Sequence, residues 1–416
     1  MENCKLSRDM MVEILSRLPV KSLMRFKCVC KFFYDLIKSD QHFMHKHYEI
    51  SKAKTDCVLL EVGYDCKEYY LLYKESEYNE IGCIYLDIPG TPRARWVKCC
   101  KGMICLISTK NDKLDNGDYL IYDIFIWNPS IRKVKDLPSV TVPYRAPCDV
   151  FALSEFGFGI SNNMTWKVVM LIEICSSFDG RTVHQITMVY SQDHGDSWSL
   201  REINSVTNFR NIQNKSNDFY LKGRYYWQTR GHGKHCLIWF DMNNEVFGTI
   251  ELPAPYYTFA LVSIMNETIV LFDSPIVGNT RCNDIWLMIE NDNNTYWCKQ
   301  ARIDSSPSIY NNIEFLRPIG IWNVDGELLV FLDRTVDPNS EHADVPYFIS
   351  LDLVTQERKM FSISKERKSI TIASNPTPGN IQVYNERNTD TIEEWKYHMS
   401  MQRINARVYY ESLYLP

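Results

Sequence analysis

The chain has 416 residues, 45% of them hydrophobic, and a formal net charge of −5. This length suits two or three domains with a sizeable core; residues 1–50 carry a net charge of +3 and the remainder −8, which argues against a nucleic-acid partner. The first residues are interrupted by charges and no run of 18 apolar residues follows, so we expect neither a signal peptide nor a membrane span, and a cytoplasmic protein with the nucleus as an alternative location.

Residues 5–50 are predicted to form several short helices. Ser7 is a good N-cap for the first helix, and Pro19 should end it near Leu18. Apolar residues recur at helical spacing before and after this proline. A segment of about 45 residues is near the lower limit for folding alone, and it holds more apolar residues than one small core needs. We therefore expect it to dock on another protein.

From about residue 57, short β-rich runs alternate with turns, and no long amphipathic helix is apparent, which predicts an all-β domain. The clearest expected strands are Cys57–Val62, Tyr69–Tyr73, Met103–Ser108, Tyr119–Trp127, Lys167–Ile174, Gln185–Ser191, Arg224–Gln228, Leu237–Asp241, Thr268–Phe272, Asp284–Ile289, Leu328–Leu332 and Phe348–Asp352.

A repeated unit organises these strands: a strand, a polar turn, and a second strand that often leads to Leu-Pro. Five copies are spaced about 47 to 64 residues apart, the range of kelch-type propeller blades. They are Ile126–Pro138, Val189–Leu200, Ile238–Pro253, Ile285–Gln300 and Ile349–Ile363, with Tyr70–Pro89 as a degenerate sixth. Each copy should be the outer hairpin of a four-stranded blade, so we predict a β-propeller-like domain of about six blades.

The N-terminal stretch resembles the F-box in its plant form. The matching residues are Leu6, Asp9, Glu13–Leu23, Arg25–Lys27, Val29–Lys31 and Asp35–Ile37. Ser7 stands where a proline is usual and Phe33 where a tryptophan is usual, and both keep the local chemistry. The alternative is an ordinary helical cap on the larger domain.

The F-box resemblance implies that this module binds a Skp-type adaptor, which bridges to a cullin and a RING protein. Adaptors of this kind are acidic as a family, which agrees with the positive charge of residues 1–50. The apolar contact or its supporting core would come from Leu6, Ile14, Leu15, Leu18, Pro19, Leu23, Phe26, Val29 and Phe33.

The repeats resemble the F-box-associated domain of plant F-box proteins. In that family Ile-Trp-Asn-Pro-Ser, Tyr-Ser…Asp-Ser-Trp, Gly-x-x-Tyr-Trp and Ile-x-x-Phe-Asp…Leu-Pro occur in this order, and here they begin at Ile126, Tyr190, Gly223 and Ile238. The opening Met1–Asn3 and the ending Val408–Leu413 most resemble the S-locus F-box proteins of nightshade-type self-incompatibility.

The resemblance implies a small all-α F-box at residues 1–50 and a propeller at 57–416, acting together as the substrate receptor of a Skp–cullin–F-box E3 ubiquitin ligase. Other subunits would catalyse ubiquitin transfer. In the S-locus family the target is a style S-ribonuclease, degraded in the pollen tube; such enzymes are basic, which agrees with the negative propeller. The alternatives are a receptor for an unrelated plant protein, an adaptor-binding protein acting outside ubiquitination, and a carbohydrate-binding propeller.

Target specificity is expected in loops that differ among blades. The candidate loops are Lys110–Asp118, Ser176–Arg181, Asn204–Asn217, Gly278–Asn283 and Val336–Val345.

Catalytic and cofactor motifs are lacking: there is no G-x-S-x-G, no P-loop and no H-E-x-x-H, so we expect no catalytic residue and no cofactor. His232, His235 and Cys236 lack a second ligand pair, so we expect no metal site. Gly157-Phe158-Gly159 is interpreted as a turn rather than a dinucleotide site. The 14 irregularly spaced cysteines are expected to be free, mostly buried thiols.

Overall fold

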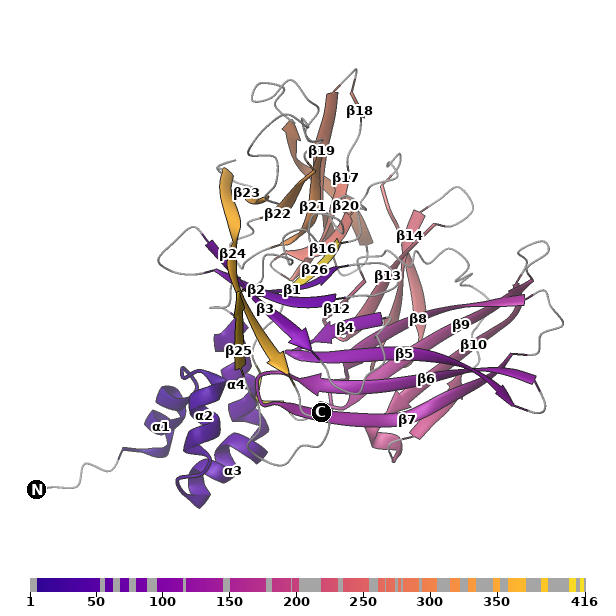
Figure 1. Cartoon of the computed structure of the whole chain (residues 1–416). Helices are drawn as coiled ribbons and strands as arrows, with labels where there is room; N and C mark the ends of the chain where they lie inside the picture. Colours follow the sequence, from indigo (N-terminus) through magenta and orange to yellow (C-terminus); the bar gives the residue numbers. More distant parts are fainter. Residues whose placement is uncertain are drawn as a thin grey trace, which may run out of the picture.

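The computed structural model describes most of the helical N-terminus and the strands that follow it (Figure 1). The described residues are 6–52, 57–62, 68–74, 80–87, 96–114, 117–144, 150–176, 182–195, 197–201, 218–230, 235–253, 261–265, 267–273, 276–277, 280–291, 294–304, 315–321, 328–333, 347–351, 358–371, 383–387, 404–408 and 412–414.

The N-terminus folds into a helical unit of four helices: α1 (Arg8–Leu15), α2 (Val20–Phe26), α3 (Lys31–Ser39) and α4 (Gln41–Lys52). Ser7 caps α1 as predicted, because its Oγ accepts a hydrogen bond from Met10 N at 3.2 Å. The α1 helix ends at Leu15, three residues before the predicted end. The backbone tightens there, with Leu18 N donating to Leu15 O at 3.0 Å, because a residue before proline disfavours the helical conformation.

Four antiparallel sheets follow one another along the chain, and each is a meander whose strands pair in sequence order. The first contains β4 (Trp96–Cys100), β5 (Met103–Leu114), β6 (Gly117–Asn128) and β7 (Lys133–Tyr144); the second β8 (Val150–Ile160), β9 (Trp166–Ser176), β10 (Thr182–Ser191) and β11 (Ser197–Arg201). The third contains β12 (Phe219–Leu221), β13 (Arg224–Arg230), β14 (His235–Asp241) and β15 (Phe247–Glu251); the fourth β16 (Leu261–Met265), β17 (Thr268–Asp273), β19 (Thr280–Asn291) and β20 (Asn294–Asp304), with the short β18 (Ile276–Val277) beside β19.

A nine-stranded sheet contains the remaining strands. One half is β21 (Phe315–Ile321), β22 (Leu328–Asp333), β23 (Tyr347–Leu351) and β24 (Arg358–Thr371), with β25 (Val383–Arg387) on β24. The other half is β26 (Ile404–Val408), β1 (Cys57–Val62), β2 (Glu68–Lys74) and β3 (Glu80–Asp87), joined to the first half by parallel pairing of β24 with β3. The C-terminal β26 thus completes a unit begun by the first strands, so the described strands form six four-stranded units.

This arrangement confirms the predicted propeller-like fold of about six blades. The first strands of successive units, β4, β8, β12, β16, β21 and β26, contact one another in that order. Eleven of the twelve expected strands fall within observed strands, and the twelfth, Phe348–Asp352, matches β23 except for Asp352, which lies outside the described residues. The five repeat copies coincide with the last two strands of their units. The degenerate sixth copy corresponds to β2 and β3.

The repeat also explains how neighbouring blades are tied at their outer edges. Trp198 Nε1, in the second unit, donates to Pro138 O of the first unit at 2.7 Å. Trp297 Nε1, in the fourth unit, donates to Glu251 O of the third at 2.9 Å. In both cases the tryptophan of one repeat copy binds the segment around the Leu-Pro end of the preceding copy, so these aromatic residues serve blade packing.

The Gly157-Phe158-Gly159 segment is not the predicted turn; it lies within β8. A Cβ on Gly157 would lie 2.7 Å from Trp227 Cζ2 and 2.9 Å from Tyr225 Cδ1 of the next unit. These glycines therefore let the aromatic side chains of the third unit pack directly against the β8 backbone. Trp227 Nε1 also donates to Phe156 O at 3.0 Å across the same seam.

We expect Gly157→Val to lower the free energy of unfolding by about 2 kcal/mol or more, because overpacking forces the fully buried Trp227 and Tyr225 out of position. Chemical denaturation of purified protein measures this. Gly195→Val is a poor comparison because that glycine has positive φ, so Thr249→Val, at an exposed position of β15, is the control. Equal stability of the Gly157→Val variant and the wild type would contradict the close packing.

The helical unit lies on one rim of the propeller, which we call the helix-side rim. Lys101 Nζ, in the turn between β4 and β5, lies 5.9 Å from the Tyr48 ring of α4, and Lys52 Nζ lies 2.6 Å from Glu267 Oε1, in the turn between β16 and β17. All described residues with positive φ lie in turns of this rim. Lys101-Gly102 and Lys222-Gly223 are two-residue hairpin loops with positive φ at both positions, which makes them short.

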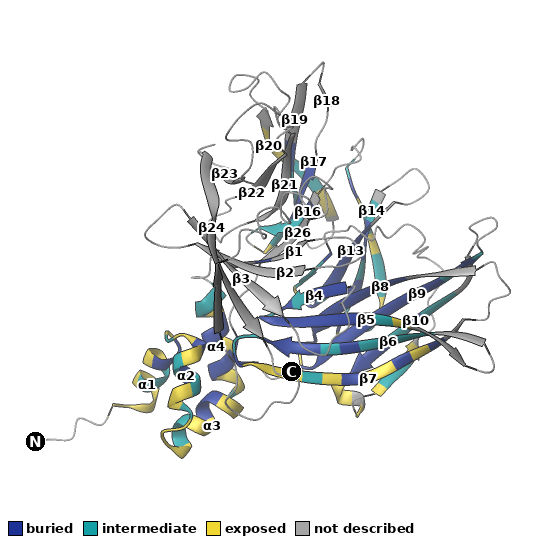
Figure 2. Ribbon diagram, viewed as in Figure 1, coloured by how far each residue is buried: buried dark blue, intermediate teal, exposed yellow. Residues whose placement is uncertain are grey.

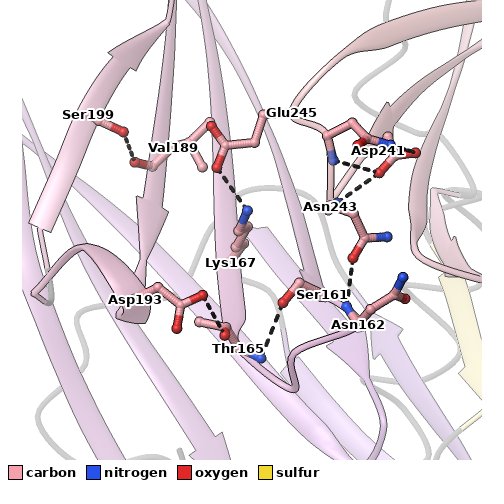
Figure 3. A network of polar contacts seen from close by, with 11 residues as sticks. Ser161, Asn162, Thr165, Lys167, Val189, Asp193, Ser199, Asp241, Asn243 and Glu245 are labelled. Carbon is pink, nitrogen blue, oxygen red and sulfur yellow. Dashed lines mark hydrogen bonds and ion pairs between the residues drawn. The ribbon is translucent and has the colours of Figure 1, made fainter.

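A polar network joins the second and third units at this rim (Figure 3). Asn162 N donates to Asn243 Oδ1 at 2.6 Å, and Lys167 Nζ lies 2.8 Å from Glu245 Oε1. Within the second unit, Thr165 Oγ1 donates to Asp193 Oδ2 at 2.7 Å. Each of these groups is bonded to a neighbouring turn, so the network stabilises the rim rather than presenting groups to a ligand.

The strand ends opposite the helix-side rim form a second rim, which we call the far rim. Because strand direction alternates, the connections β5–β6, β9–β10, β11–β12, β18–β19 and β22–β23 lie there. Figure 1 shows the tips of β5, β6, β9 and β10 pointing away from the helices. The five candidate specificity loops fall at these strand ends, but parts of them are strand: Lys110–Leu114 belong to β5, Gly117 and Asp118 to β6, and Thr280–Asn283 to β19. Residues 115–116, 177–181, 204–217, 278–279 and 336–345 of these segments lie outside the described part of the chain.

An ion cluster on β19 and β20 predicts acid sensitivity. Arg302 Nε and Nη2 donate to the two carboxylate oxygens of Asp284 at 2.6 and 2.9 Å, and Lys299 Nζ lies 2.7 Å from Asp284 Oδ2. The hydrogen bonds from Arg302 lower the pKa of Asp284 despite its burial. A lowered folded-state pKa stabilises the fold above the unfolded-state pKa, and this contribution is lost as pH falls through the folded-state value.

We therefore expect Asp284→Asn to reduce the free energy of unfolding at pH 7 by about 1–2 kcal/mol, since both cations are half-exposed and screened. The difference from wild type should shrink as the pH is lowered below about 4. Denaturant titrations at pH 7, 5 and 3.5 measure it. A difference that is constant with pH would contradict the ion-pair explanation.

Candidate functional site

The helical unit exposes an unusual amount of apolar surface. Figure 2 shows its core residues buried beside exposed positions on the same helices. Of the ten large hydrophobic side chains that are exposed among the described residues, six lie between positions 6 and 34: Leu6, Met10, Ile14, Phe26, Val29 and Tyr34. Clustered exposed hydrophobic residues mark an interaction surface.

One line of this surface runs along α1. Leu6, Met10 and Ile14 are spaced four residues apart, so they form one stripe on the helix and its N-terminal extension. Leu15 on the other side of α1 is buried in the core. The α1 helix therefore has an inward and an outward apolar side, and about half of the Ile14 residue, 49%, is exposed.

A second group surrounds the loop between α2 and α3. Phe26 and Val29 are exposed, and the half-buried Phe33 packs edge-on against Phe26 with 5.9 Å between ring centroids. Phe33 also lies 5.6 Å from the Phe32 ring. Phe33 thus supplies a large aromatic side chain that joins Phe26 and Phe32 in this group.

Lysines surround Tyr34 at the edge of this group. Lys38 Nζ donates to Tyr34 Oη at 2.6 Å and Lys27 Nζ lies 5.3 Å from the ring centroid. The hydrogen bond from Lys38 lowers the pKa of Tyr34. This edge is positively charged and suits an acidic partner.

The nine residues predicted for adaptor contact or its supporting core include both exposed and buried side chains, and their role in adaptor binding stays a prediction. Exposed members are Leu6, Ile14, Pro19, Phe26 and Val29; Leu15 and Leu23 are buried; Leu18 and Phe33 are intermediate. Sequence reasoning missed Met10 and Tyr34 as surface residues. The four-residue spacing of Met10 from Leu6 and Ile14 is the signal that would have found it.

A buried charge cluster lies at the first strands of three units. Lys98 on β4 binds Asp218, immediately before β12, and its Nζ lies 3.7 Å from Glu155 Oε2 on β8. Tyr225 Oη donates to Asp218 Oδ2 at 2.8 Å. All four side chains are buried, so the cluster ties three units together at their inner strands.

The described part of the chain offers little support for a metal or nucleophile site. No group of three or more His, Cys, Asp or Glu residues there could hold a metal ion, and His232 lies outside that part. Eight described cysteines are free, of which Cys28 and Cys30 are exposed. Burial raises the pKa of Cys100 and Cys105, which makes these thiols poor nucleophiles. No helix among the described residues is long and apolar enough to cross a membrane.

Comparison with protein families places both parts of the chain. A family model of the F-box domain matches residues 4–44, and a model of the F-box associated beta propeller domain matches residues 93–360, which is more than half of the chain. The chain belongs to the F-box-associated β-propeller family. Its N-terminal F-box and its propeller-like domain are therefore the two parts of an F-box protein.

Curated relatives agree with this assignment. The chain is 28% identical over 357 residues to the F-box/kelch-repeat protein At3g23880 of Arabidopsis thaliana, covering 78% of this chain and 84% of the relative. It is 25% identical to the F-box/kelch-repeat protein At3g17530 of the same plant, covering 68% and 70% of the two chains, and 26% identical to the putative F-box protein At3g25460, covering 75% and 82%.

Proposed function

We propose that this F-box protein is the non-catalytic substrate receptor of a Skp–cullin–F-box E3 ubiquitin ligase. Residues 1–50 bind the Skp-type adaptor, and through it the cullin and RING subunits, while residues 57–416 bind the target. The observation that carries the proposal is the exposed apolar surface of the F-box, formed by Leu6, Met10 and Ile14 on one side and Phe26, Val29 and Tyr34 on the other.

Adaptor binding accounts for two features of the F-box, its exposed apolar side chains and its positive charge. Apolar residues of this size are costly to expose in one small unit, and burial against a partner removes that cost. The lysines beside Tyr34 and the net charge of +3 on residues 1–50 complement an acidic adaptor.

For the target, we propose a non-self S-ribonuclease in the cytosol of the pollen tube. The net charge of −8 beyond residue 50 favours a basic partner of this kind. The strand directions support a target surface on the far rim, because the helix-side rim is occupied by the F-box and the five candidate specificity loops share the opposite rim.

The deciding experiment is co-purification from pollen tubes with the proteasome blocked, followed by reconstitution with purified adaptor. We expect recovery of adaptor, cullin and S-ribonuclease. Recovery of adaptor and cullin with a different target would overturn the S-ribonuclease proposal and leave the ligase role intact. Failure of the purified chain to bind adaptor would overturn the ligase role itself.

A further inference from the structure

The segment Ser412–Tyr414, which we call the C-terminal brace, lies between the F-box and the propeller. Figure 1 places the C-terminus beside the helices and β7. All three residues of the brace are buried. A chain end that is buried in this way must be held by specific contacts, because terminal residues otherwise remain loosely ordered.

Asn128 at the end of β6 fixes the brace to the propeller. This side chain is fully buried, and its Nδ2 donates to Ser412 O at 3.0 Å, to Ser412 Oγ at 3.1 Å and to Tyr414 O at 2.9 Å. Its Oδ1 accepts from Ser130 N at 2.9 Å, and Ser412 N donates to Ser130 Oγ at 3.4 Å. The Asn-Pro-Ser part of the first repeat copy therefore binds the chain end.

Tyr414 connects the brace to the F-box. Its ring centroid lies 5.9 Å from that of Tyr48 on α4 and 6.0 Å from that of Trp166 on β9, and Lys101 Nζ lies 5.9 Å from the Tyr48 and Tyr414 centroids. The Tyr414 hydroxyl is buried without a hydrogen-bond partner among the described residues. The ring, rather than the hydroxyl, therefore makes this joint.

The brace also completes a continuous apolar core. Buried residues of α1 to α4, of the first two sheets and of the brace form one cluster. The ion pair between Lys52 and Glu267 is a further link between the units, but the Glu267 side chain is 56% exposed, so this link contributes little. The orientation of the F-box on the propeller thus depends on a buried joint in which Tyr414 is central.

We propose that the C-terminal brace is a positioning element of the ligase, which fixes the angle between the adaptor-binding F-box and the target-binding propeller. The proposal rests on the proposed function. Ubiquitin transfer requires the target lysine to stay near the loaded enzyme, and a freely moving joint would lower their effective concentration without altering either binding surface.

The first test needs neither adaptor nor target. Spin labels are attached through unnatural amino acids at the exposed positions Lys21 and Lys133 of the full chain, and the distance distribution between them is measured. We expect Tyr414→Ala to widen this distribution at least about twofold, because it removes the ring between Tyr48 and Trp166. Tyr414→Phe should retain the wild-type width, since it keeps the ring and loses only an unpaired hydroxyl. An unchanged width in Tyr414→Ala would overturn the proposal.

The second test measures positioning in the assembled ligase, with a purified S-ribonuclease as the probe. We expect Tyr414→Ala to bind adaptor and ribonuclease with wild-type affinity but to lower the rate of ubiquitination at saturating ribonuclease about fivefold or more, with Tyr414→Phe restoring it. A widened distribution with an unchanged rate would overturn the positioning role. Failure of the wild type to bind adaptor or ribonuclease would instead contradict the proposed function, and the distance measurement would still test the brace.

If Tyr414→Ala does not fold, Tyr414→Leu, which keeps an apolar side chain, replaces it in both measurements.

Discussion

Ile14→Glu should weaken adaptor binding by about 100-fold or more. Ile14 lies one turn after Met10 on the exposed stripe of α1, and about half of it is exposed, so the substitution leaves the core intact. In the complex, the glutamate would be buried against an acidic, apolar partner without a cation to pair with it. Loss of an interface anchor together with burial of an unpaired charge costs about 3 kcal/mol or more.

Isothermal titration with purified Skp-type adaptor measures this loss. Leu200→Glu is the matched control, because Leu200 is also an exposed aliphatic residue, 67% accessible, but lies on β11 of the propeller. The free energy of unfolding of both variants should stay within about 1 kcal/mol of the wild-type value. Wild-type affinity in a folded Ile14→Glu variant would show that the adaptor does not bind the α1 stripe.

Replacing Lys98 with methionine should produce the largest loss of stability, about 3–5 kcal/mol. The substitution leaves two buried carboxylates, Asp218 and Glu155, without the cation that neutralises them. Because these groups belong to β4, β8 and the residue before β12, the damage would reach three blades at their inner strands. The triple substitution that also changes Asp218 to Asn and Glu155 to Gln should recover much of the loss, since it removes the unpaired charges.

Denaturant unfolding of the purified proteins measures both effects, with Lys110→Met as the control. Lys110 pairs with Asp123 on the same sheet, but its side chain is 54% exposed, so its removal should cost less than about 1 kcal/mol. Equal losses for Lys98→Met and Lys110→Met would contradict the buried cluster as a stabilising element.

Local periodicity determined much of the fold. The five repeat copies predicted the outer hairpins of their blades because a strand–turn–strand unit is encoded by neighbouring residues. Ser7 predicted the start of α1 for the same reason. The surplus of apolar residues in the F-box predicted an uncovered surface, but not which side chains form it, because that depends on how α1 to α4 pack.

Features that join distant segments required the tertiary structure. The sequence suggests that Gly157 is a turn residue, yet it lies in the strand β8. A glycine is needed there because aromatic side chains of the next blade occupy the space that a Cβ would fill. The cluster of Lys98, Glu155 and Asp218 brings together residues up to 120 positions apart. The placement of the candidate specificity loops on one rim follows from the sheet order, which no local pattern reveals.

The sequence by itself therefore determined the two units of this F-box protein and their strands and helices, because those depend on short-range patterns. Only the tertiary structure decided how the units are joined. Asn128 and Tyr414 are 286 positions apart, and their contact exists because β26 returns to pair with β1 and delivers the chain end to the F-box. Such a contact joins segments far apart in the chain, and no spacing of residues along the chain encodes it.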